Sequence, residues 1–268
     1  MYSFSYPAER FADFPAVSAF DMQAIDNAMI EADPVTLYQM MERAGLAVAE
    51  IAACYTSDDR PKVAVLVGKG NNGGGALSAA RQLANRGAEL QVVLTTPAQN
   101  LGEAPAAQLR ILTALHPETP VHDMSKISMD NLPSLPECDI ILDGLLGYNI
   151  RGVPKEPIST LIMIANNAEV PTISVDIPSG LHPDTGEPAP PTILAAATVT
   201  LALPKRGFQS EQARQYLGDL YLAQIGISQY IIQSVNKDWS VNFATEAILY
   251  LALPAIPQRP DTLTALSA

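Results

Sequence analysis

Charged residues and cysteines are scarce in this 268-residue sequence, and their scarcity excludes several classes of protein. Only 16% of the residues are charged, and the formal net charge is -12 with a pI near 4.6. Because such an acidic surface repels phosphate backbones and anionic lipid, we expect no nucleic-acid or membrane partner. The two cysteines, Cys54 and Cys138, form no C-x-x-C motif, which leaves no zinc or redox motif in view. We interpret both as small buried hydrophobic side chains.

A targeting signal and a long apolar run are also missing. The first residues, MYSFSYPAERFADFPAV, contain no basic segment followed by an apolar one, so they do not resemble a signal peptide. The longest apolar stretches, such as TILAAATVTLALP at 192–204, are too short to span a bilayer and end at proline. We therefore expect a cytoplasmic protein in a reducing environment.

What the sequence does contain is an alternation of apolar strands and helices. Hydrophobic residues make up 48% of the chain, which is ample for a buried core. Apolar runs predict strands over 62–68, 90–96, 138–143, 171–176, 196–204 and 218–227. Helical spacing predicts helices over 17–33, 35–55, 74–86, 104–115 and 155–168, and a further helix is compatible with 210–217. This order predicts an α/β fold with a parallel sheet that is covered on both faces.

A glycine-rich loop follows the strand at 62–68. Gly68, Gly70 and Gly73 have the G-x-G-x-x-G spacing that lets backbone N–H groups approach a phosphate at a helix N-terminus. A nicotinamide dehydrogenase would place an acidic residue after the next strand, but LTTPAQN has none, and no Gly-Lys-Ser/Thr closes a Walker loop. Close packing of strand and helix is the structural alternative for these glycines. The loop also carries Asn71 and Asn72, which we interpret as ligand-binding amides.

Two aspartates come directly after predicted buried strands. Asp143 lies in ILDGLLG and Asp176 in SVDIPSG, so each carboxyl falls at the carboxyl end of a strand, as Gly68 does. Ligands of open α/β sheets bind at this edge, so we expect one crevice to gather all three. Carboxylate and amide oxygens together suit a hard cation, and a partly buried carboxyl can transfer protons. Capping of the following turn is the alternative role for each aspartate.

The segments GKGNNGGG, ILDGLLGYNIRG, ISVDIPSGLHPDTG and ATVTLALPKRG appear in that order over 68–207. Together with LYQMMERAGLAVAE, they resemble the YjeF N-terminal domain family, which includes apolipoprotein A-I-binding protein-like chains. The similarity covers roughly residues 18 to 235. It implies a Rossmann-like three-layer αβα sandwich with a mostly parallel central sheet. We expect this domain over 1–235 and a C-terminal arm or tail over 236–268.

The resemblance also implies an activity, the epimerisation of the R and S forms of hydrated NAD(P)H, which repairs damaged nicotinamide nucleotides. Asp176 would contact the reacting nucleotide, and it is our prediction for the acid or base. A potassium ion would be the cofactor, held by Asn72, Asp143 and Ser179. The remaining residues that the resemblance assigns to substrate binding are Asn71, Asn72, Gly73, Gly74 and Gly75 around the diphosphate, and Gly147, Tyr148, Asn149, Ile150, Arg151, Gly152 and Val153 in a turn that wraps the substrate.

The sequence departs from the family pattern at two acidic positions. The family's NNGGD loop ends here in Gly75, and its A-D-x-T segment has Ala196 in place of the acid. Gly75 is expected to loosen substrate contacts, so a weakened nucleotide-binding or protein-interaction scaffold of the same fold is the alternative function. Lys205 matches the family's PK-x-G segment, and we interpret it as structural or solvated. Expected partners are the hydrated nucleotide, a separate dehydratase acting in the same pathway and, from the apolar N-terminal helices and tail, a second copy in a homodimer.

Overall fold

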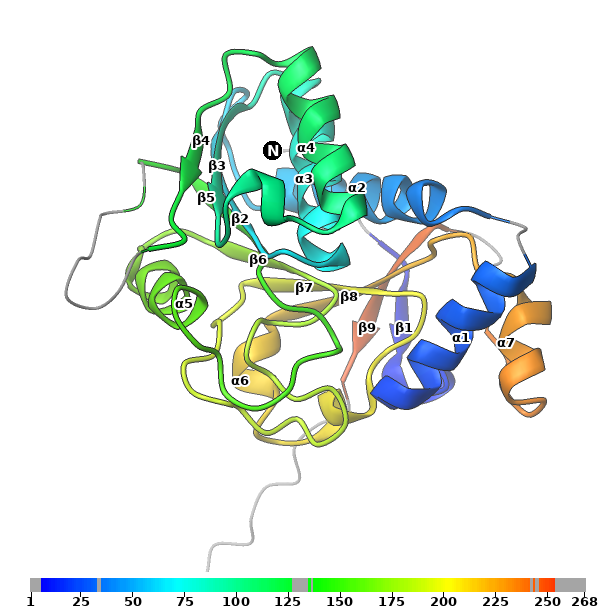
Figure 1. Ribbon diagram of the computed structural model, residues 1–268. Helices are drawn as coiled ribbons and strands as arrows, with labels where there is room; N and C mark the ends of the chain where they lie inside the picture. Colours follow the sequence, from blue (N-terminus) through cyan, green and yellow to red (C-terminus); the bar gives the residue numbers. More distant parts are fainter. Residues whose placement is uncertain are drawn as a thin grey trace, which may run out of the picture.

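The computed structural model describes residues 6–32, 35–126, 135, 137–241, 243 and 246–253. Within these residues one nine-stranded sheet runs through the molecule in the order β1-β9-β8-β7-β6-β5-β2-β3-β4 (Figure 1). The strands are β1 (Ala8–Arg10), β2 (Lys62–Val67), β3 (Glu89–Leu94), β4 (Val121–Asp123), β5 (Ile140–Gly144), β6 (Thr172–Val175), β7 (Ala197–Leu201), β8 (Asp219–Ala223) and β9 (Ile248–Ala252).

The sheet is parallel except at one pair of strands. β9 runs antiparallel to β8, with Leu222 opposite Leu249, and parallel to β1 on its other side. Residues of the expected C-terminal arm therefore contribute β9 to the sheet, between β8 and β1. The predicted α/β class with a mostly parallel central sheet is confirmed.

Helices cover both faces of the sheet, because the crossover connections between parallel strands place helices there. Figure 1 shows α2, α3 and α4 on one face, α5 and α6 on the other, and α1 beside α7 at one side. The helices are α1 (Ala19–Ala32), α2 (Leu37–Cys54), α3 (Asn71–Ala84), α4 (Glu103–Leu115), α5 (Ile158–Asn167), α6 (Arg214–Leu217) and α7 (Gln229–Val235). Among the described residues, no helix is both long and apolar enough to span a bilayer.

The alternation of side chains along β2 explains this layering. Val63 and Val65 pack into the cluster that includes α2, α3 and α4, whereas Ala64 and Leu66 pack with Leu161 of α5. Each of these side chains is fully buried, so β2 reads in the sequence as a continuous apolar run. The two cysteines differ from expectation: Cys54 is exposed, so its interpretation as buried is wrong, and Cys138 is partly buried.

The direction of strand addition reverses between β2 and β5. The chain proceeds from β2 outward to β3 and β4 on one side, and from β5 to β6, β7 and β8 on the other. β2 and β5 are themselves paired, with Val67 opposite Gly144. The loops at the carboxyl ends of these two strands diverge to opposite faces and leave a crevice, which is where open α/β sheets bind ligands.

Candidate active site

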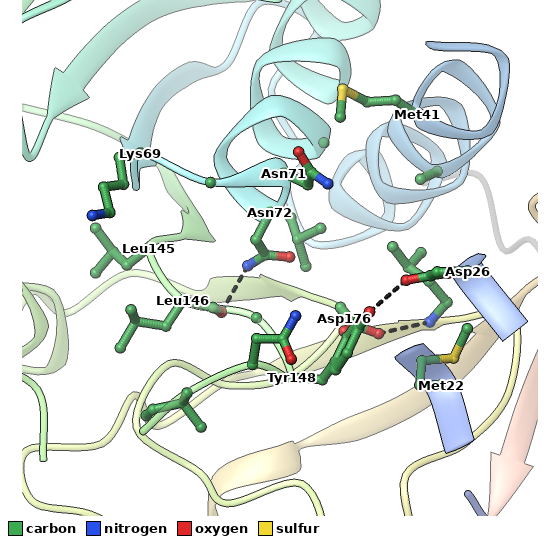
Figure 2. A pocket seen from close by; sticks show the side chains of 18 of the residues that line it. Met22, Asp26, Met41, Lys69, Asn71, Asn72, Leu145, Leu146, Tyr148 and Asp176 are labelled. Carbon is green, nitrogen blue, oxygen red and sulfur yellow. Dashed lines mark hydrogen bonds between the residues drawn. The ribbon is translucent and has the colours of Figure 1, made fainter. Parts of the chain in front are cut away.

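A cavity of about 890 Å³ lies at this edge of the sheet. Its walls are the start of α3, the loop after β5, the ends of β6 and β7, and the inner sides of α1 and α2. Figure 2 shows side chains from these separate elements pointing into the same space. The volume is within the range of about 300–1,000 Å³ that is typical of small-molecule sites.

The beginning of α3 forms one wall. The helix starts at Asn71, three residues earlier than the sequence pattern predicted, so both asparagines lie in its first turn. Gly70 precedes it and no side chain caps the helix, which leaves the first N–H groups available to an anion. Gly70, Asn71 and Asn72 all line the cavity, as does Gly75 one turn later.

The other glycines of the loop allow close packing. A Cβ at Gly68 would lie 1.9 Å from the carbonyl oxygen of Leu145, and one at Gly73 would lie 2.1 Å from that of Gly68. A Cβ at Gly74 would meet the sulfur of Met41 at 2.7 Å. The packing alternative therefore describes these three positions, and the loop combines tight packing with an open helix end.

Asn72, Ser179 and Asp143 meet around one backbone segment. The side-chain amide of Asn72 donates to the carbonyl oxygen of Leu146 at 2.8 Å, and the N–H of Leu146 donates to Oγ of Ser179 at 2.9 Å. Oγ of Ser179 in turn donates to Oδ1 of Asp143 at 2.6 Å. The three residues that the resemblance assigned to a cation thus come together from α3, the end of β5 and the loop after β6.

Asp143 lies beneath the cavity and does not line it. Its side chain is completely buried, and it accepts further hydrogen bonds from Oγ of Ser174 at 2.8 Å and from the N–H of Ser179 at 2.9 Å. Burial raises the pKa of Asp143, while the hydrogen bonds from Ser179 and Ser174 oppose the rise. No cation partner offsets the burial among the described residues, so a bound cation beside this carboxyl would stabilise its charged form.

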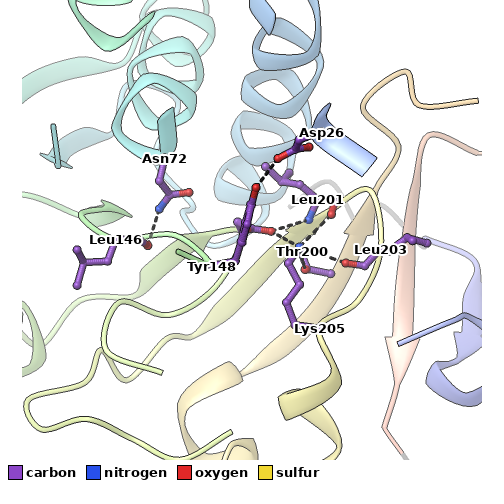
Figure 3. Close-up of polar contacts among 9 residues, drawn as sticks. Asp26, Asn72, Leu146, Tyr148, Thr200, Leu201, Leu203 and Lys205 are labelled. Atoms are coloured by element: carbon purple, nitrogen blue, oxygen red, sulfur yellow. Dashed lines mark hydrogen bonds and ion pairs between the residues drawn. The ribbon is translucent and has the colours of Figure 1, made fainter. Parts of the chain in front are cut away.

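Asp176 reaches the cavity from the end of β6 and is paired with a buried lysine. Its Oδ1 accepts from the ammonium of Lys205 and from the N–H of Leu201 at 3.2 Å. Figure 3 shows Lys205 beside Thr200, Leu201 and Leu203. Lys205 is 1% exposed and also donates to Oγ1 of Thr200 at 3.1 Å and to the carbonyl oxygens of Leu201 and Leu203. Of the two interpretations of Lys205, solvated is therefore wrong, whereas structural agrees with its burial and its four hydrogen bonds.

The backbone at Asp176 is held in an unusual conformation. Its φ angle is +67°, in the left-handed region that non-glycine residues seldom adopt. The N–H of Asp176 donates to the carbonyl oxygen of Val199 at 2.8 Å, which ties this turn to β7. Such conformations persist where surrounding contacts enforce them, and they are frequent at functional sites.

The turn after β5 forms the wall of the cavity next to the start of α3. Among the residues assigned to substrate wrapping, Gly147, Tyr148, Asn149, Ile150, Arg151 and Val153 line the cavity. The Tyr148 hydroxyl donates to Oδ2 of Asp26 on α1, and the Asn149 amide donates to Oε1 of Gln23 at 3.3 Å. Two hydrogen bonds therefore fasten this turn to α1.

Five of the predicted site residues lie outside the cavity lining: Gly73, Gly74, Gly152, Asp143 and Ser179. Gly73 and Gly74 are buried within α3, and Gly152 has φ +69° at the exposed end of the turn. Conversely, Asp26 and Lys205 line the cavity without having been assigned a role. Asp26 sits in an amphipathic helix of the N-terminal segment, and nothing in its sequence spacing connects it to residues more than a hundred positions away.

A family model described as "YjeF-related protein N-terminus" matches residues 37–207. The chain belongs to this family. That span includes the start of α3, the turn after β5, Asp176 and Lys205, but not Asp26.

Relatives of the YjeF-related chain include proteins named as enzymes. An "NAD(P)H-hydrate epimerase" from Dehalogenimonas lykanthroporepellens is 34% identical over 77% of this chain and 80% of its own length. A "Bifunctional NAD(P)H-hydrate repair enzyme Nnr" from Salinibacter ruber is 31% identical over 90% of this chain. The chain spans 46% of that relative's length, and 38% of a similar enzyme from Leishmania braziliensis.

The fold of this YjeF-related chain has been observed before. The crystal structure of the yeast protein ynu0 (YNL200c) superposes with a TM-score of 0.71 and covers 89% of this chain and 100% of its own. At 24% sequence identity this likeness establishes the architecture alone. It agrees with the three-layer arrangement described above.

Proposed function

We propose that this chain epimerises the R and S forms of hydrated NAD(P)H. The relatives named above support this substrate class. The observation that carries the proposal is the position of Asp176: its carboxyl, paired with buried Lys205, lines the same cavity as the open N-terminus of α3. One wall thus offers an anion site and another a group that can exchange protons.

The charges along the cavity suggest how the nucleotide is oriented. Lys69 and Arg151 are exposed at its rim, and Gly70 and Asn71 present the helix N-terminus nearby. Asp26 and Asp176 lie deeper, beside Tyr148. The diphosphate therefore binds at the rim, where the helix dipole and cations favour negative charge, and the hydrated ring points toward the two carboxyls.

The reaction requires little machinery. The hydroxyl on the ring carbon next to the nitrogen is protonated and leaves as water, while the nitrogen lone pair forms a carbon–nitrogen double bond. Water then adds to the opposite face of that carbon and loses a proton. Asp176 exchanges protons with the oxygen bound to the reacting carbon. Backbone carbonyl oxygens hold the ammonium of Lys205 in place beside Asp176. A positioned acid or base typically contributes about 10²–10⁴-fold to such a step.

Potassium is the proposed cofactor. Asn72, Ser179 and Asp143 offer amide, hydroxyl and carboxylate oxygens around Leu146, which is the donor set that a hard cation takes. Among the described residues, no group of three or more His, Cys, Asp and Glu side chains gathers, so these oxygens suit an alkali cation better than zinc. When bound, the cation supplies positive charge next to the diphosphate.

A coupled assay tests the proposal. (R)-hydrated NADH is incubated with an S-specific dehydratase, and the return of NADH is followed with and without this chain. The expected result is acceleration over spontaneous epimerisation, and loss of that acceleration in Asp176→Asn. Because Asn leaves the ammonium of Lys205 without its counter-charge, circular dichroism must show that the variant is folded at the assay temperature.

A scaffold without catalytic activity is the second candidate, and Gly75 favours it. A loop carboxyl expected from the family is missing at this position of the cavity wall. If the chain binds NADH or its hydrate but does not accelerate epimerisation, the scaffold function is correct. Turnover of NAD with a small alcohol or ketone would instead indicate an oxidoreductase.

The proposed partners follow from the chemistry. A dehydratase that acts on the S epimer would consume the product, since the bifunctional relatives span more than twice the matched length. A homodimer and a cytoplasmic location also remain proposals. Phe20 and Ile30 of α1 and Tyr230 of α7 are exposed by 81%, 64% and 78%, and light scattering of Phe20→Ser tests whether they form a dimer contact.

A further inference from the structure

Asp26 brings a second carboxyl to the cavity from an element that no family motif covers. It lies in the middle of α1, and its Oδ2 accepts a hydrogen bond from the hydroxyl of Tyr148 (Figures 2 and 3). Its Oδ1 has no hydrogen-bond partner among the described residues. This oxygen is also absent from the unpaired polar atoms that are fully buried, so it retains some accessible surface. One oxygen of Asp26 is therefore fixed by Tyr148, and the other is available to a ligand.

The surroundings of Asp26 make its carboxyl a weaker acid than a free aspartate. Burial raises the pKa of Asp26, and the nearby negative charge of Asp176 adds to the rise. The hydrogen bond from Tyr148 and the positive charge of Lys205 act in the opposite direction, but the net shift is upward. Within the described part of the chain, the titratable groups that act on Asp26 are these three, from the loops after β5, β6 and β7.

Asp176 has a different set of direct contacts. It accepts from the ammonium of Lys205 and from a backbone N–H, and both interactions stabilise a negatively charged carboxylate. One cavity therefore contains two carboxyls, one in direct contact with a buried ammonium and one without a cation in direct contact. Pairs of carboxyls whose environments differ in this way divide the roles of acid and base.

We propose that Asp26 is a second catalytic residue of the epimerisation, an inference that rests on the proposed function. Asp26 is the acid, and Asp176 is the base. Protonated Asp26 gives its proton to the ring hydroxyl, the carbon–oxygen bond breaks, and its electron pair leaves with the water formed. The nitrogen lone pair makes the carbon–nitrogen double bond. The second water forms the new carbon–oxygen bond on the opposite face and gives its proton to the carboxylate of Asp176. For the reverse epimer the two carboxyls exchange roles.

This assignment makes a specific prediction for the pH profile. An acid must be protonated, so the rate falls as the pH rises through the pKa of Asp26. Tyr148 holds that pKa down by its hydrogen bond. Tyr148→Phe removes the bond, so the alkaline limb of the profile should shift to higher pH even if substrate affinity also changes.

The coupled assay measures the rate of epimerisation over a range of pH, and the spontaneous rate is subtracted. The proteins compared are wild type, Asp26→Asn, Tyr148→Phe and Glu31→Gln. Asp26→Asn should lower kcat by about 10²–10⁴-fold, with KM within about threefold, and should abolish the alkaline limb. Glu31→Gln, at an exposed position of the same helix, should match wild type.

The possible outcomes separate the inference from the proposed function. If wild type accelerates epimerisation but Asp26→Asn keeps its rate and its alkaline limb, Asp26 is not the acid and only the inference fails. If wild type gives no acceleration, both fail. If Asp26→Asn does not fold, Tyr148→Phe decides, because an unmoved alkaline limb in that variant overturns the assignment and an upward shift supports it.

Discussion

Removal of the buried ammonium of Lys205 is the most direct perturbation of this site. Lys205→Met keeps the length of the side chain but leaves the carboxyl of Asp176 without its cation in a setting where it is 4% exposed. The oxygens of Thr200, Leu201 and Leu203 lose their donor as well. Breaking a buried ion pair by removing one partner costs about 3–5 kcal/mol of folding free energy, because an uncompensated charge remains.

The magnitude can be checked by thermal and denaturant unfolding. For a domain of this size each kcal/mol lowers Tm by about 2–4 °C, so Lys205→Met should lower Tm by roughly 10 °C. The double variant Lys205→Met/Asp176→Asn removes both charges and should recover more than half of the loss. Lys237→Met is the matched control at an exposed lysine and should change stability by less than about 0.5 kcal/mol.

Two results would refute this reasoning. A loss below about 1 kcal/mol in Lys205→Met would mean that water or a rearranged neighbour replaces the ammonium and that the pair is not buried in solution. A double variant no more stable than Lys205→Met would mean that the loss comes from packing around the lysine stem, and not from the uncompensated carboxylate.

Three further predictions concern the cavity and its floor. Gly75→Asp should tighten nucleotide binding, because a Cβ there meets only Val175 Cγ1 at 3.3 Å and a carboxylate can accept hydrogen bonds from ribose hydroxyls. Calorimetry measures the affinity, with Gly75→Ala as the control. Unchanged or weaker affinity for Gly75→Asp would indicate a differently shaped site. Asp26→Asn should raise Tm at neutral pH, because the pKa of Asp26 is raised in the folded protein. Asp26 then stabilises the fold most at low pH, where its carboxyl is protonated in both the folded and the unfolded state. That contribution is lost as the pH rises through the pKa of the folded state. The gain should vanish in acid, and a gain that is independent of pH would contradict this account. Ser179→Ala should abolish any dependence of activity or Tm on potassium, measured against sodium, whereas a potassium response retained in Ser179→Ala would place the cation elsewhere.

Local patterns in the sequence predicted much of the fold. β2, β3 and β5 to β8 were each predicted, because strands buried on both faces appear as continuous apolar runs. β1, β4 and β9 were not predicted. β1 and β4 have only three residues each, which is too short for a period to show in the sequence. β9 depends on its pairing with β8 and β1, which lie on either side of it in the sheet. The start of α3 was also placed too late, because glycine and asparagine have weak helix propensity and only the contacts around Gly68, Gly73 and Gly74 hold them in a helix.

Local patterns are enough to specify the α/β class and to place Asn72, Asp143 and Asp176 at the ends of buried strands or the start of a helix, since hydrophobic period and turn residues are local properties of a chain. Which groups face one another depends on how the whole chain folds. The pairing of Lys205 with Asp176, and of Asp26 with Tyr148, joins residues 29 and 122 positions apart. No local propensity encodes such a contact, because it depends on strand order and on how α1 packs against the sheet edge. The proton chemistry proposed for the site depends on these two pairs.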